Sequence, residues 1–87
     1  MFKKITDKAL GKKYELSLVI CGDKLSNNHN VLSYPLSKDS GEIFLNPKRA
    51  KPFTLLELFI HACAHLKGLD HSPAMEKFES RIHKSLK

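Results

Sequence analysis

Hydrophobic side chains recur at two different spacings along the chain, and each spacing predicts one kind of element. In residues 2–10 they fall at roughly helical intervals and stop at Gly11, which predicts a short helix. In residues 14–21 they alternate with polar residues, which predicts a strand, and the alternate positions also become apolar toward its end. We therefore expect that end of the strand to be covered on both faces. Residues 23–28 fit either a single helical turn or a loop.

Two further strands joined by a turn are predicted in the middle of the chain. Residues 31–36 have strand character and include Pro35, which cannot donate to a ladder and so confines the end of this strand to a sheet edge or to a non-pairing geometry. Residues 37–41 are rich in turn formers. Residues 42–45 are then expected to form the next strand.

The last third of the chain predicts two helices separated by a bend. Thr54 and Glu57 have the spacing of a capping box in front of residues 55–66, which are apolar on nearly every helical face. A helix of that kind belongs at the centre of a small fold. Gly68 can take the left-handed conformation that ends it. A serine followed by proline at residues 72–73 predicts the start of the final helix.

These elements predict one domain over residues 1–87, of the α/β (α+β) class. We expect a mixed sheet of about three strands, packed against the buried helix and the C-terminal helix. A hydrophobic fraction of 41% and a charged fraction of 28% are ordinary for a globular domain. A chain of 87 residues buries only a marginal core. A metal whose ligands converge only in the native state would therefore add useful stability.

Three histidines follow one another closely near the C-terminal end. His61 and His65 are four residues apart, so they lie one turn apart on one helix face. The bend after Gly68 can return His71 to that face. Three imidazoles with a fourth position left open are the ligands of a catalytic zinc site. We predict that they bind one Zn²⁺ ion per chain, against the alternative of three unrelated surface or core histidines.

Ala62 distinguishes this histidine motif from the H-E-x-x-H motif of the common zinc peptidases. In H-E-x-x-H the glutamate is the general base, and alanine cannot move a proton. A zinc metallopeptidase is therefore disfavoured, although the spacing keeps it as an alternative. Imidazoles also bind nickel and copper, so another metal-binding or storage role stays open.

Three short motifs occur in a fixed order along the chain. They are V-L-S-Y-P at residues 31–35, G-E-I at 41–43 and H-x-x-x-H-x-x-G-x-D-H at 61–71. In this order they resemble the YbeY family of bacterial rRNA maturation factors, over residues 14–86 or so. The resemblance implies a YbeY-like fold and a zinc-dependent, single-strand-specific endoribonuclease. Such an enzyme acts in maturation of the 3′ end of small-subunit rRNA and in ribosome quality control.

The resemblance also assigns roles to individual residues. It makes the three histidines the zinc ligands, and the metal-activated water would attack a phosphodiester. Asp70 matches the acidic residue beside the third histidine. It is either a hydrogen-bond partner of the ligands or a turn residue at the helix end.

The positive net charge is the remaining feature of the sequence that indicates a class of binding partner. Fifteen Lys and Arg against nine Asp and Glu give a net charge of +6, which favours a polyanion such as RNA. The resemblance specifies rRNA and the ribosomal small subunit, and we expect no DNA partner. The arginine-bearing segment that relatives carry before V-L-S is missing here. Lys24, Lys48 or Arg49 would have to replace it, and we name Lys48 and Arg49 as RNA-binding candidates. The oligomeric state cannot be read from the sequence.

The missing arginine segment also supports a second interpretation, a non-catalytic ribosome assembly factor with a structural metal site. The chain carries no hydrophobic secretory segment and no stretch long enough to span a membrane, so we expect a cytoplasmic protein. The spacing of Cys21 and Cys63 is not that of a metal-binding or redox pair, and we expect both to be buried reduced thiols.

Overall fold

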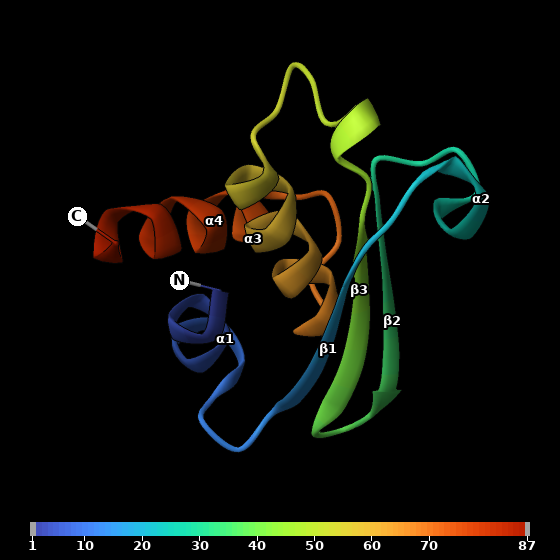
Figure 1. Cartoon of the computed structure of the whole chain (residues 1–87). Helices are drawn as coiled ribbons and strands as arrows, with labels where there is room; N and C mark the ends of the chain where they lie inside the picture. The colour runs from blue at the N-terminus through green and yellow to red at the C-terminus, as the bar shows by residue number, and fades with distance from the viewer. Residues whose placement is uncertain (1, 87) are drawn as a thin grey trace.

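A three-stranded mixed sheet carries its main helices on one face (Figure 1). The computed structural model describes residues 2–86. In chain order the elements are α1 (Phe2–Leu10), β1 (Glu15–Ile20), α2 (Asp23–Ser26), β2 (Val31–Ser37), β3 (Ser40–Leu45), the short 3₁₀ helix η1 (Pro47–Arg49), α3 (Leu55–Leu66) and α4 (Pro73–Ser85). This confirms the predicted fold class, the mixed three-stranded sheet and the two C-terminal helices.

The last strand in sequence is the central strand in space, because the sheet order is β1-β3-β2. β1 pairs with β3 in parallel, with Leu18 opposite Ile43, and β2 pairs with β3 antiparallel. Pro35 therefore lies on an edge strand, as predicted, and the register of β2 shifts between Pro35 and Ser37. Gly41, Ile43 and Leu45 of the central strand are buried on the helix-covered face.

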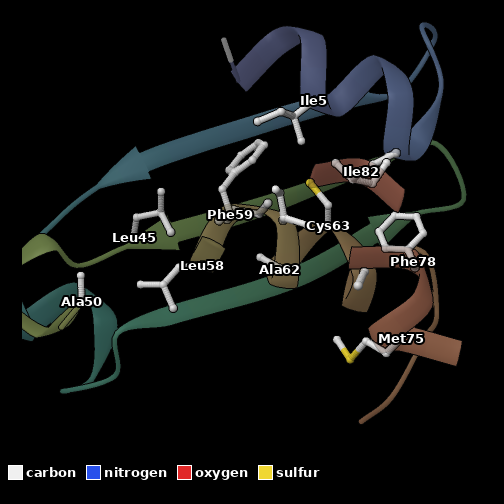
Figure 2. Close-up of a cluster of buried hydrophobic side chains, with 14 residues drawn as sticks. Ile5, Leu45, Ala50, Leu58, Phe59, Ala62, Cys63, Met75, Phe78 and Ile82 are labelled. Carbon is white, nitrogen blue, oxygen red and sulfur yellow. The ribbon is translucent and has the colours of Figure 1, made fainter. Parts of the chain in front are cut away.

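The helix α3 forms the centre of the molecule. Six of its residues are buried: Leu58, Phe59, Ile60, Ala62, Cys63 and Ala64. It packs against β2 and β3 on one side and against α1 and α4 on the other. Figure 2 shows the buried side chains, with Phe59 between α1 and the sheet and Met75 and Phe78 on α4. Burying one such large side chain stabilises the fold by roughly 1.5–3 kcal/mol, so α3 has a fixed place in the core.

Two details of the core differ from the sequence predictions. The end of β1 is not covered on both faces, because Ile20 is 54% exposed. β1 is an edge strand and the helices cover only one face of the sheet. Cys21 is only partly buried for the same reason, whereas Cys63 is fully buried as expected. None of the helices described within residues 2–86 combines the length and the apolar character needed to cross a bilayer.

Candidate metal centre

The three histidines converge, as their spacing predicts. One ring nitrogen from each of His61, His65 and His71 lies within 4.8 Å of the other two. The ring centroids are 4.7 Å apart for His61 and His65, and 5.0 and 5.2 Å for the pairs with His71. His61 and His65 are partly buried and His71 is exposed. The cluster is thus anchored in the protein and open on one side.

The bend that delivers His71 is a regular helix ending. Gly68 adopts a φ of +96°, and its N–H donates to the carbonyl of His65 at 2.9 Å. The N–H of Leu69 donates to the carbonyl of Ala64 at 3.0 Å. These two bonds form a Schellman motif, which uses glycine because a left-handed residue with a Cβ is strained. The motif reverses the chain within a few residues and so brings His71 back over α3.

A hydrogen bond to Glu79 assigns the tautomer of the His61 ring. The Nδ1 of His61 lies 3.2 Å from the Oε2 of Glu79, and an ionised carboxylate can only accept, so Nδ1 carries the proton. In neutral His61 the lone pair therefore lies on Nε2, which faces the Nε2 of His65.

The Nε2 atoms of His61 and His65 lie 3.2 Å apart, a separation that suits two ligands of one metal ion. In a tetrahedral site with Zn–N bonds of about 2.0–2.1 Å, neighbouring ligand nitrogens lie about 3.4 Å apart. The residues present thus fit a zinc ion.

Electrostatics favour the neutral form of His65, which is the form that can bind a metal. Burial lowers the pKa of His65, and the neighbouring rings of His61 and His71 lower it further. The Leu69 hydrogen bond and the charge of Asp70 oppose this shift without reversing it. His65 is therefore neutral near pH 7, with its lone pair free to coordinate.

An open cleft of about 620 Å³ adjoins the cluster. Its walls come from β2, from α3 and α4, and from the loop before α3, and they include Ser33, Phe53 and His83 beside the three clustered histidines. This volume lies within the range of small-molecule sites. Among the described residues no lysine or arginine lines it. A ligand that enters the cleft would reach the open side of the histidine cluster.

No protein-family model, curated protein or solved structure matches this chain. The interpretation of the site therefore depends on its own residues and geometry. Two observations carry it, namely the spacing of the histidines in the sequence and their convergence in space.

Asp70 lies beside the cluster as a turn residue. Its side chain is exposed, and its backbone carbonyl accepts a hydrogen bond from the Ser72 hydroxyl at 2.9 Å. Within residues 2–86 its carboxylate forms no hydrogen bond with a histidine. Of the two roles predicted for Asp70, this geometry favours the turn, and its charge acts on His65 only through space.

Lys48 and Arg49, the RNA-binding candidates, lie at η1 and do not line the cleft. Arg49 binds Asp23 through two contacts, Nε to Oδ1 at 2.6 Å and Nη2 to Oδ2 at 3.1 Å. Lys48 Nζ lies 3.5 Å from the same carboxylate, and its side chain is 77% exposed. One carboxylate thus offsets part of the positive charge here. RNA binding by Lys48 and Arg49 stays a prediction.

Glu79 is the site residue that the sequence analysis missed. It lies on α4, 18 positions after its partner His61, and the H-x-x-x-H motif gives no hint of it. The one feature of the sequence that could have indicated Glu79 is its place in the helix, immediately after the buried Phe78. A carboxylate next to an inward-facing stripe is half-buried and needs a partner.

Proposed function

We propose that this chain is a zinc-dependent endoribonuclease of the YbeY type. It would cleave single-stranded RNA in the maturation of the 3′ end of small-subunit rRNA and in ribosome quality control. One observation supports the chemistry most directly: three imidazoles converge beside an open cleft. The V-L-S-Y-P, G-E-I and histidine motifs support the choice of RNA as substrate.

Each part of the site has a task in this proposal. Zinc, when bound, lowers the pKa of a water to about 7 and polarises a phosphoryl oxygen. His61, His65 and His71 hold the ion and leave the cleft side free. Phe53, which is 50% exposed and lines the cleft, offers an aromatic face on which a base can stack. The basic surface of the chain would attract the RNA backbone without reading its sequence.

The peptidase alternative lacks a base in this geometry. Ala62 lines the cleft beside the metal cluster, where a zinc peptidase has its glutamate. Glu57 also lines the cleft, but it accepts from the Thr54 backbone N–H at 2.9 Å in the capping box. Hydrogen bonding to Thr54, chiefly to its backbone, lowers the pKa of Glu57. Glu79 is already bound to His61.

RNA cleavage by the zinc-loaded protein tests the proposal. The zinc content is first measured by elemental analysis, and the same preparation is then incubated with single-stranded rRNA fragments and with a duplex of matched sequence. We expect cleavage of the single strand only, and its loss with a chelator or in the His61→Ala/His65→Ala variant. His29→Ala is the matched control, because His29 is exposed and lies outside the cleft. Equal cleavage by the double variant and the parent would contradict the proposal.

A non-catalytic assembly factor remains the second candidate, because no lysine or arginine of the described residues lines the cleft. In that case the metal would mainly stabilise the fold, by linking His71 in the bend before α4 to the two histidines of α3. A metal present at 100 times its Kd stabilises the native state by about 2.7 kcal/mol. Chelation would then lower Tm by about 10–20 °C, while the zinc-loaded protein would show no turnover. An unchanged Tm after metal removal would argue against this candidate.

A further inference from the structure

Glu79 joins the C-terminal helix to the metal cluster. Its Oε2 lies 3.2 Å from Nδ1 of His61, and the two side chains are 28% and 26% exposed. The contact is thus partly shielded from water, and it connects two helices that are separate in the sequence. Glu79 binds the Nδ1 of His61, whereas the other ring nitrogen, Nε2, points to His65.

The neighbours of Glu79 hold it in this position. α4 is anchored by three buried residues, Met75, Phe78 and Ile82, which are 1%, 5% and 2% exposed. Glu79 directly follows Phe78, so the packing of α4 against α3 fixes its backbone beside His61. The carboxylate also lines the cleft that opens on the cluster. Its placement therefore depends on the core and not on the metal.

We propose that Glu79 is a positioning residue of the metal centre, and this inference rests on the proposed metal site. By accepting a hydrogen bond from the Nδ1–H group, Glu79 holds His61 in the tautomer whose Nε2 lone pair faces the cluster. It also fixes the orientation of the ring plane. Its negative charge makes the Nε2 of His61 a stronger electron-pair donor to the metal ion. Loss of such a partner outside the coordination sphere typically weakens metal binding about 10–100-fold.

Zinc affinity measured by competition with a chelator of known affinity tests this role without reference to RNA. We expect Glu79→Ala to bind zinc about 10–100-fold more weakly than the parent protein. Glu79→Gln should lose less, because its amide oxygen still accepts from Nδ1 but carries no charge. Glu15→Gln is the control, since it removes the same charge from an exposed residue on β1. It should bind zinc as the parent does.

A spectroscopic signature separates positioning from a general loss of structure. We expect the visible spectrum of the cobalt-loaded Glu79→Gln protein to differ from that of the parent in band position or intensity. The Tm of the metal-free variant should match that of the metal-free parent. If Glu79→Ala fails to fold, Glu79→Gln alone decides the question.

The outcomes also separate this inference from the proposed function. If the parent protein binds no zinc, the metal centre itself is overturned and the role of Glu79 with it. If the parent binds zinc and Glu79→Gln binds it equally tightly with an unchanged cobalt spectrum, only the positioning role is overturned. RNA cleavage can then still be tested as before.

Discussion

At the scale of single residues, the two cysteines differ in their surroundings although neither is bonded. Cys63 is fully buried in α3, and desolvation raises the pKa of its thiol to about 12. Cys21 follows the edge strand β1 and is partly exposed. Since the thiolate is the reactive form, Cys63 is unreactive on two counts, poor access and a high pKa.

Thiol labelling of the native protein should therefore show two classes of cysteine. At pH 8 we expect an aromatic disulfide reagent to modify one thiol readily and the second only after denaturation. The Cys21→Ser variant should lose the fast phase and keep the slow one. Rapid labelling of both thiols in the folded protein would show that Cys63, and with it the core face of α3, is not buried.

A second prediction concerns Gly41, which is needed for space and not for its backbone angles. A Cβ at this position would lie 2.5 Å from the Tyr14 hydroxyl oxygen, 3.0 Å from Leu66 Cδ2 and 3.1 Å from the Tyr34 carbonyl oxygen. We expect Gly41→Ala to destabilise the protein by about 1–3 kcal/mol, as overpacking does. Urea denaturation measures the change.

Tyr14→Phe provides the matched variant for this contact. The Tyr14 hydroxyl is buried and has no hydrogen-bond partner within the described part of the chain. Removing it should therefore be neutral or stabilising by up to about 1 kcal/mol. It also vacates the space that the new methyl group needs, so the double variant should recover part of the stability lost in Gly41→Ala. A Gly41→Ala protein as stable as the parent would contradict this packing.

At the scale of elements, Asp23 ties α2 to η1. It accepts from Nε of Arg49 at 2.6 Å and from Nδ2 of Asn46 at 2.8 Å. Hydrogen bonding to Arg49 first, and to Asn46 next, holds the pKa of Asp23 well below its usual range. A carboxylate whose pKa is lower in the folded state stabilises it fully above its unfolded pKa of about 3.9. That contribution is lost as the pH falls below this value toward the folded pKa.

The Asp23→Asn variant should therefore be less stable than the parent at pH 7. The difference should shrink as the pH drops below about 4, because the parent then loses its own advantage. Urea midpoints of both proteins, measured between pH 7 and pH 2.5, give the comparison. A difference that stays constant or grows in acid would contradict the ion pair.

Local features of the sequence predicted the elements well, because their signals lie within a few residues. The capping box of Thr54 and Glu57 is formed, and Ser72 caps α4 by accepting from the Met75 N–H. Gly68 ends α3 in the left-handed conformation. The histidine cluster was predictable for the same reason, since two ligands share a helix face and the third follows a helix ending.

Contacts between distant segments could not be predicted from one sequence. The bond between Asp23 and Arg49 joins residues 26 positions apart, and Glu79 meets His61 over 18. Neither pair has a periodicity that marks it. The exposure of Ile20 depends on which face of the sheet the helices cover, and that choice follows from tertiary packing.

At the scale of the whole molecule, the histidine cluster lies beside a cleft whose walls come from β2, α3 and α4. The radius of gyration is 12.2 Å, close to the value of about 12 Å expected for a compact chain of this length. The buried hydrophobic residues form one cluster around α3. A domain of this size has little stability to spare. A metal bound by α3 and the following bend would connect the site directly to the stability of the fold.

X-ray absorption at the zinc edge tests whether the three histidines bind the metal, because it reports which atoms coordinate the ion in the loaded protein. We expect three imidazole nitrogens at about 2.0–2.1 Å and one further light ligand. The signal should disappear from the His61→Ala/His65→Ala protein, which should retain no stoichiometric zinc. Sulfur at about 2.3 Å, or a shell without imidazole, would show that these three histidines are not the metal centre.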